Sequence, residues 1–117
     1  KIQNHKKSLI ELLKKLKKNK KKVMGLGAST KGNVILQYCK INKNLIKNIY
    51  EINRDKFGKF TPGSNIKILS DKKINRKNCD YLLVLPWHFK DHIIKKEKKL
   101  IQQGIKLIFP LPQIEIV

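Results

Sequence analysis

The chain has 117 residues, of which 40% are apolar, and a formal net charge of +20. This length suits one domain that buries its own core, and the apolar fraction excludes a disordered chain. No run approaches the ~18 apolar residues of a membrane span, and the first residues lack a signal-peptide core, so we expect a cytoplasmic protein with no membrane partner.

Lysine carries almost all of the positive charge, because only Arg54 and Arg76 among the 28 basic residues are arginine. Proteins that read phosphates and bases specifically favour arginine for its planar fork. The one dense lysine run, residues 14–22, falls where a predicted helix ends and cations suit the helix dipole. We therefore interpret the charge as a solvated surface. A nucleic-acid-binding module is a disfavoured alternative, which a steep loss of binding between ~50 and ~200 mM salt would support.

The first half of the chain alternates predicted helices and strands. Apolar residues at helical spacing predict a helix over 2–19, which the lysine run ends. Residues 22–26 are a short predicted strand, residues 30–39 a helix, and residues 45–52 a second strand with Glu51 near its carboxyl end.

Turn residues dominate the middle of the chain. A loop with Gly58 and the turn dipeptide Pro62-Gly63 precedes a short predicted strand over 66–69. Residues 71–76 are a weak helical turn. Residues 81–85 are uniformly apolar, which is typical of a strand buried on both faces of a parallel sheet.

The last part predicts a helix over 89–103 with Gly104 as its C-cap. A buried strand over 105–109 and a last strand over 114–117 follow. The order of elements predicts an α/β fold with a mainly parallel sheet. We expect one domain over residues 1–117.

Within that domain we expect a leading helix in residues 1–20 and an α/β core over 22–117. Ligands of such sheets bind outside the carboxyl ends of the strands. The stretch GLGASTKGN, Glu51 and the segment Pro86-Trp87-His88-Phe89 all lie at such ends. The pattern therefore predicts one crevice that gathers them.

The stretch GLGASTKGN, residues 25–33, joins a predicted strand to a predicted helix. Its glycines permit a tight turn, Lys31 supplies a charge, and Ser29 and Thr30 supply hydroxyls beside a helix N-terminus that favours anions. Gly32 allows close packing of helix on strand. The third glycine comes two residues later than the dinucleotide fingerprint requires, and Lys31 precedes Gly32, unlike a P-loop. We predict an anion or nucleotide site, with a purely structural turn as the alternative.

The second candidate cluster follows the buried strand. Trp87, the only tryptophan, could stack on a base or a sugar ring, and His88 could act as a base or a hydrogen-bond donor. In the alternative interpretation, Trp87 and Phe89 pack the rim of the sheet and His88 caps the next helix. We expect His5 and His92 at the surface.

The remaining chemistry-bearing residues form no catalytic pattern. Cys39 and Cys79 match no metal spacing and are expected as buried thiols rather than a disulfide. The chain has no Ser-His-Asp pattern and no paired-carboxylate signature. The residues therefore indicate a binding module or a part of a larger enzyme.

Four blocks of sequence follow one another: GLGASTKGNVILQYC, EINRDKFGKFTPGSNIKILS, DYLLVLPWHFKDHI and GIKLIFPLPQIEIV. In order and approximate spacing, from about Leu9 to Val117, they resemble the C-terminal domain of S-adenosylmethionine-dependent sugar C-methyltransferases. These enzymes act on nucleotide-linked keto-deoxysugars. The resemblance implies a Rossmann-like, three-layer α/β domain with an N-terminal helix. It also implies that this domain binds the nucleotide-sugar.

The resemblance extends to single positions. The family motif G-x-G-A-x-x-K-G-N is matched by Gly25, Gly27, Ala28, Lys31, Gly32 and Asn33. The family's TPG turn is matched by Thr61, Pro62 and Gly63, and its tryptophan followed by asparagine or histidine is matched by Trp87 and His88. Members often carry an aspartate at the end of the second strand, and Glu51 is the nearest acidic residue here. Its place is near that of the acidic residue that holds a ribose hydroxyl in nicotinamide-binding folds, so we include Glu51 among the candidate substrate-binding residues. We expect the backbone amides of Ala28 to Lys31, together with the Lys31 charge, to receive the substrate's diphosphate.

The resemblance also places the rest of the machinery outside this chain. Full-length members have a zinc-binding domain, a central domain that holds S-adenosylmethionine, and a C-terminal domain, and only the third is similar to this sequence. We expect no catalytic residue, metal or cofactor here; zinc and S-adenosylmethionine belong to the full-length parent, whose other domains would be partners. The start KIQNHKKSL agrees with an excised piece.

Two other functions stay open. One is a stand-alone binding module for nicotinamide nucleotides or CoA, against which the late third glycine counts. The other is a structural or dimerisation domain without a ligand.

Overall fold

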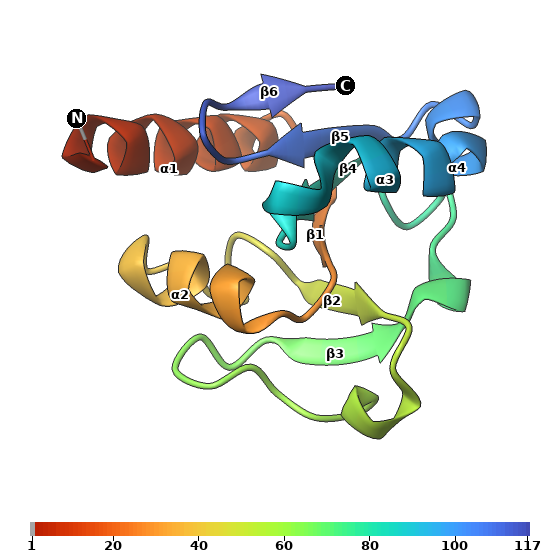
Figure 1. Ribbon diagram of the computed structural model, residues 1–117. Helices are drawn as coiled ribbons and strands as arrows, with labels where there is room; N and C mark the ends of the chain where they lie inside the picture. The colour runs from red at the N-terminus through yellow and green to blue at the C-terminus, as the bar shows by residue number, and fades with distance from the viewer. Residues whose placement is uncertain (1) are drawn as a thin grey trace.

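Residues 2–117, which this computed structural model describes, build a six-stranded sheet in the order β3-β2-β1-β4-β5-β6 (Figure 1). The strands are β1 (Val23–Leu26), β2 (Asn48–Glu51), β3 (Lys67–Ser70), β4 (Tyr81–Val84), β5 (Lys106–Phe109) and β6 (Glu115–Ile116). The first five are parallel, and β6 pairs antiparallel with β5. The predicted α/β fold with a mainly parallel sheet is confirmed. The chain runs outward from β1 to β3 and then returns to place β4 on the other side of β1.

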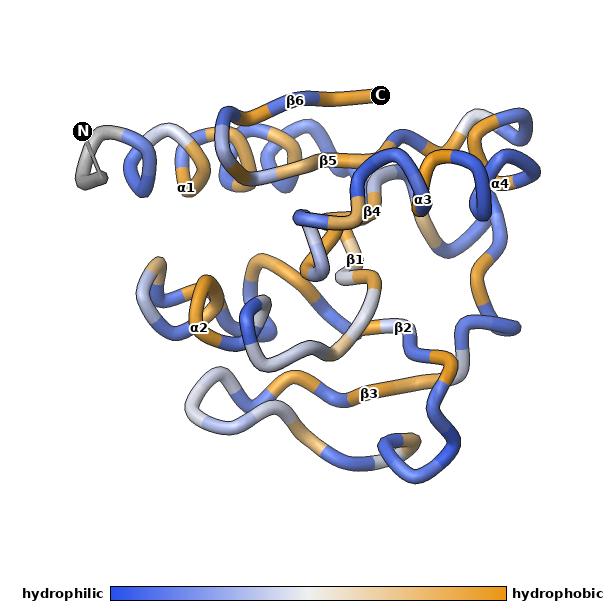
Figure 2. The backbone as a smooth tube through the Cα atoms, viewed as in Figure 1, coloured by the Kyte–Doolittle hydropathy of each residue, from blue (hydrophilic) through white to orange (hydrophobic). Residues whose placement is uncertain are grey.

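Helices cover both faces of the sheet. They are α1 (Ile2–Lys18), α2 (Thr30–Tyr38), α3 (Lys90–Lys96) and α4 (Lys98–Gln102), with the 3-10 turns η1 (Arg54–Lys56), η2 (Asp71–Lys73) and η3 (Trp87–Phe89). One apolar cluster joins α1 and α2 to the sheet, and a second joins α3 and α4 to the opposite face. Figure 2 shows the consequence, since α1 alternates between apolar and hydrophilic residues while the strands are mostly apolar. Within the described residues no helix has the length and apolarity to cross a bilayer.

Side-chain alternation along the strands divides the core between the two faces. Val23 and Leu83 belong to the cluster under α1 and α2, whereas their neighbours Met24 and Leu82 belong to the cluster under α3 and α4. Both sides of each central strand are therefore buried, which explains the uniformly apolar runs in the sequence.

Three local predictions are wrong. Strand β2 begins at Asn48, because Leu45 and Ile46 donate their N–H groups to the Asn42 carbonyl in a turn. The predicted helix over 89–103 is divided, because Glu97 leaves helical backbone angles (φ −98°, ψ 25°) between α3 and α4. His5, expected at the surface, is half-buried, and its Nε2 is hydrogen-bonded to the Pro110 carbonyl oxygen.

The other histidine and cysteine predictions hold. His92 is exposed, and both cysteines are free and buried. Burial raises the pKa of Cys79 to about 12, and its thiol donates to the Tyr81 carbonyl oxygen. Burial also raises the pKa of Cys39, so neither thiol is poised for chemistry.

Gly32 brings α2 into close contact with the end of the sheet. A Cβ at this position would lie 2.3 Å from the Leu85 Cβ and 3.1 Å from the Leu85 Cα. The predicted close packing of helix on strand is confirmed. Gly27 has a different role, because its φ of +83° makes the turn that leads into α2.

We expect Gly32→Ala to lower the free energy of unfolding by about 1–3 kcal/mol, because overpacking against Leu85 outweighs the gain of about 1 kcal/mol in helix propensity. Urea denaturation measures this change. Lys31→Ala, at an exposed position of the same helix, is the control and should stay within about 0.5 kcal/mol of the wild type. A stabilised Gly32→Ala variant would contradict the close contact.

Candidate functional site

The site lies where the carboxyl ends of β1, β2 and β4 meet. The chain leaves β1 and β4 toward opposite sides of the sheet, and such a switch point opens a crevice in α/β folds. The turn Gly27–Ser29 stands in this opening and separates two hollows that both contact Ala28 and Ser29.

The first hollow, the sheet-edge crevice, has a volume of about 280 Å³ and lies between the turn, the end of β2 and helix α3. The second, the lysine hollow, has a volume of about 400 Å³ and lies between the start of α2 and the loop before β3. Its walls are formed by Thr30 and Asn33 on one side and by Lys56, Lys59, Phe60 and Thr61 on the other.

Most N–H groups of the glycine turn bond within the protein. Gly27 donates to the Tyr50 carbonyl oxygen at 2.7 Å, and Ser29 donates to the Gly27 carbonyl oxygen at 3.0 Å. Ser29 is the N-cap of α2, and its Oγ accepts the Gly32 N–H at 3.0 Å. These bonds give the turn one shape before any ligand arrives.

Glu51 ties the turn to the end of β2. Its Oε1 accepts the Ala28 N–H at 2.8 Å, and its Oε2 accepts the N–H groups of Ile52 and Asn53, each at 2.8 Å. A carboxylate that binds three backbone donors organises the loop around itself. Both oxygens face the backbone here, and a hydroxyl-binding role for Glu51 stays a prediction.

These internal bonds determine which amides remain for an anion. Among the described residues, the N–H groups of Thr30 and Lys31 have no hydrogen-bond partner, and both lie in the first turn of α2. The predicted amide set from Ala28 to Lys31 is therefore reduced in this structure to its last two members. The dipole of α2 adds partial positive charge at the same place.

Lysines surround this helix end. Lys56 donates from Nζ to the Ala28 carbonyl oxygen at 2.6 Å and so braces the turn. Lys59 lines the lysine hollow, and Lys31 is exposed and lines neither hollow. Asn33 also lines the lysine hollow, and its Oδ1 is buried without a hydrogen-bond partner in the described part of the chain.

Trp87 and His88 lie beside the two hollows, whereas Pro86 and Phe89 of the same segment line the sheet-edge crevice. Trp87 is half-buried against the apolar cluster under α1 and α2, and His88 is exposed. The His88 ring lies 5.6 Å from the Trp87 ring and 4.1 Å from the Phe89 ring, between centroids. Of these three residues, Phe89 lines the sheet-edge crevice.

The structure thus brings together part of the predicted site. Gly27, Ala28, Ser29 and Glu51 meet at the crevice, and Ala28, Ser29, Thr30 and Asn33 meet at the lysine hollow. Gly25 and Gly32 are buried, and they serve packing, because a Cβ at either would collide with Ile49 or Leu85. Lys31, Trp87 and His88 line neither hollow.

Sequence reasoning missed the contribution of the loop before β3. Lys56, Lys59 and Phe60 stand opposite the glycine turn only because β2 and β3 are paired in parallel. The TPG turn was the available signal for this loop, whereas its lysines do not stand out in a chain with 28 basic residues.

Charges of both signs line the sheet-edge crevice. Asp71 and Glu97 contribute carboxylates, and Lys56 and Lys96 contribute cations. Burial raises the pKa of Glu97; the charge of Lys96 opposes this shift, and the Asp71 carboxylate adds to it. The lysine hollow has no carboxylate among its described lining residues and so favours anions more strongly.

Comparison with known proteins gives matches over most of this chain. A family model described as the C-methyltransferase C-terminal domain matches residues 1–112. A protein named C-methyltransferase NovU, from Streptomyces niveus, is 33% identical over 107 residues, which cover 92% of this chain and 26% of that protein. The chain therefore spans about a quarter of the length of this curated relative.

We expect Glu51→Ala to lower the free energy of unfolding by about 1–2 kcal/mol, because the half-buried Ala28 N–H loses its acceptor. Urea denaturation without ligand is the measurement. Glu11→Ala is the matched control, since Glu11 is exposed and its ion pair with Lys7 is 4.0 Å long. Unchanged stability of Glu51→Ala would show that Glu51 is free for a ligand instead.

We expect Glu97→Gln to become more stable relative to the wild type as the pH rises from about 4 to about 7. The pKa of Glu97 is higher in the folded chain than in the unfolded chain. The stabilisation that protonated Glu97 gives the wild type is therefore fully present below the unfolded pKa and is lost as the pH rises through the folded pKa. The test is urea denaturation at several pH values, with Glu11→Gln as the control. A pH-independent difference would rule out this linkage.

Proposed function

We propose that this chain, which belongs to the C-methyltransferase C-terminal domain family, is the nucleotide-sugar-binding part of a longer methyltransferase. The parent would act on a nucleotide-linked keto-deoxysugar in the cytoplasm. The short span relative to NovU supports a partial chain, because about three quarters of that relative has no counterpart here.

The observation that carries this proposal is the start of α2 beside the lysine hollow. The free N–H groups of Thr30 and Lys31 lie at a helix N-terminus, and Lys59 and Lys56 stand across the hollow. A diphosphate needs several donors and positive charge from more than one side. The start of α2 and the lysines supply the donors and the positive charge. No carboxylate is among the described residues that line the hollow.

The residues have separate parts in this binding. The Thr30 and Lys31 amides and the Lys31 and Lys59 ammonium groups contact the diphosphate. Lys56 holds the Ala28 carbonyl oxygen, so it shapes the turn and adds positive charge on the same wall of the hollow as Lys59. The site orients the sugar for the reaction of the parent, and this contribution is one of proximity rather than acid–base chemistry.

S-adenosylmethionine supplies the methyl group in the proposed parent, and the residues here do not fit it well. Adenosine-binding crevices of this fold place a free carboxylate at the end of the second strand for the ribose, whereas Glu51 is bound to three backbone N–H groups. Zinc does not fit either, because the described residues contain no group of three or more His, Cys, Asp or Glu that could hold a metal. We assign neither group to this chain.

Titration of the chain with thymidine diphosphate tests the proposal, with fluorescence of the only tryptophan, Trp87, and calorimetry as readouts. We expect saturable binding, weakened about tenfold or more by Lys31→Ala and by Lys59→Ala, because each removes a charge-assisted contact.

The matched control is Lys98→Ala in α4, which lines neither hollow and should bind like the wild type. If millimolar thymidine diphosphate does not bind, or if the three variants bind equally well, the diphosphate does not bind at the start of α2. Family membership would stand in either case.

A further inference from the structure

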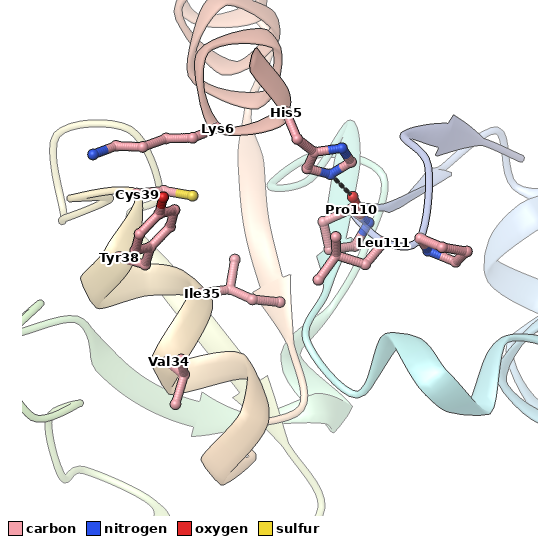
Figure 3. A pocket seen from close by; sticks show the side chains of 9 residues that line it. His5, Lys6, Val34, Ile35, Tyr38, Cys39, Pro110 and Leu111 are labelled. Atoms are coloured by element: carbon pink, nitrogen blue, oxygen red, sulfur yellow. Dashed lines mark hydrogen bonds between the residues drawn. The ribbon is translucent and has the colours of Figure 1, made fainter. Parts of the chain in front are cut away.

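A second, apolar hollow lies away from the glycine turn. This groove, of about 370 Å³, runs between the first turns of α1, the exposed side of α2 and the segment after β5 (Figure 3). Val34, Ile35 and Tyr38 form one wall, and Pro110, Leu111 and Pro112 form the other. His5 and Lys6 of α1 close one end.

The α2 side of the groove exposes apolar surface that the domain itself does not cover. Val34 and Tyr38 stand one helical turn apart, and 60% and 47% of their surfaces are exposed. A surface helix typically turns its apolar residues toward the core. Contiguous exposed apolar residues around a hollow mark a surface for another polypeptide.

The groove is held open by contacts within the described chain. The hydrogen bond between His5 Nε2 and the Pro110 carbonyl oxygen ties α1 to the opposite wall, as Figure 3 shows. The Lys6 Nζ lies 5.0 Å from the centroid of the Tyr38 ring and orients it by a cation–π contact. A preformed groove loses little conformational freedom when a ligand segment enters.

The comparisons point to the occupant. In NovU this domain accounts for 26% of the length, and the family description places it at the C-terminus, so most of such a protein precedes it. The preceding polypeptide would join at α1, whose His5 and Lys6 form the end of the groove. The occupant therefore arrives beside the groove by covalent connection, at high effective concentration.

Charge adds a second constraint on the occupant. Lys6 stands at the rim, no acidic residue is among the described residues that line the groove, and the chain as a whole carries +20. An occupant with an apolar side chain and a neighbouring carboxylate complements both features.

We infer that the groove is the docking surface for the polypeptide that precedes this domain in the full-length methyltransferase, through an apolar residue seated between Val34 and Leu111 and a carboxylate facing Lys6. The inference rests on the proposed function only in that the chain is part of a longer enzyme. It does not depend on where the nucleotide binds.

Hydrogen exchange tests the docking directly. Exchange of the amides of residues 33–39, which are hydrogen-bonded in α2, is compared between the 117-residue chain and the full-length product of the same gene. We expect these amides to exchange about tenfold more slowly in the full-length protein, because docking opposes local opening of α2. Residues 67–70 of β3, on the far edge of the sheet, should exchange at the same rate in both.

Variants of the full-length protein assign the effect to the groove. Val34→Glu should return exchange of residues 33–39 to the rate of the short chain. Val34 is 60% exposed, so the fold tolerates this substitution. Ile116→Glu is the matched control, because Ile116 is 47% exposed and outside the groove. Thymidine diphosphate binding by the Val34→Glu chain should equal that of the wild type.

Three results would overturn the inference. The first is equal exchange of residues 33–39 in the short and full-length proteins. The second is a gene product with no polypeptide before this domain. The third is a dimer of the short chain that Val34→Glu dissociates, which would make a second copy the occupant. Loss of nucleotide binding alone would instead contradict the proposed function and leave the docking intact.

Discussion

The close contact between Gly32 and Leu85 is the constraint on which the rest of the site depends. Because a glycine lets α2 approach the end of β4, the first turn of the helix lies directly over the switch point of the sheet. The Ser29 cap, the two free N–H groups and the lysine hollow all follow from that position. A larger residue would move the helix end away from the lysines that face it.

The glycine turn is then held in place by side chains rather than by glycine alone. Glu51 binds the Ala28 N–H and Lys56 binds the Ala28 carbonyl oxygen. Ala28 is thus held by a carboxylate at its N–H and by an ammonium group at its carbonyl oxygen. The bond to Glu51 removes the Ala28 N–H from the set that could bind an anion, and the bond to the Gly27 carbonyl oxygen removes the Ser29 N–H. The N–H groups of Thr30 and Lys31 remain, so the proposed diphosphate position lies on the side of α2.

Helix α2 connects the two proposed binding surfaces. Its first turn forms part of the lysine hollow, whereas Val34 and Tyr38 line the apolar groove. The helix has nine residues and is short enough that both surfaces share its stability. A polypeptide seated in the groove would therefore contact the same helix that holds the nucleotide, with no long path between them.

The sequence by itself determined the class of fold, the place of the glycine turn and the family, because hydrophobic periodicity, turn residues and ordered motifs are local properties. The packing role of Gly32 could also be predicted from the sequence, since Gly32 follows a strand-to-helix turn. The tertiary structure alone decided the strand order and the charged partners of the turn. Glu51 and Ala28 are 23 residues apart, Lys56 and Ala28 are 28 apart, and His5 and Pro110 are 105 apart. No local pattern encodes such pairs, because they depend on which strands pair and which helix ends meet when the sheet forms.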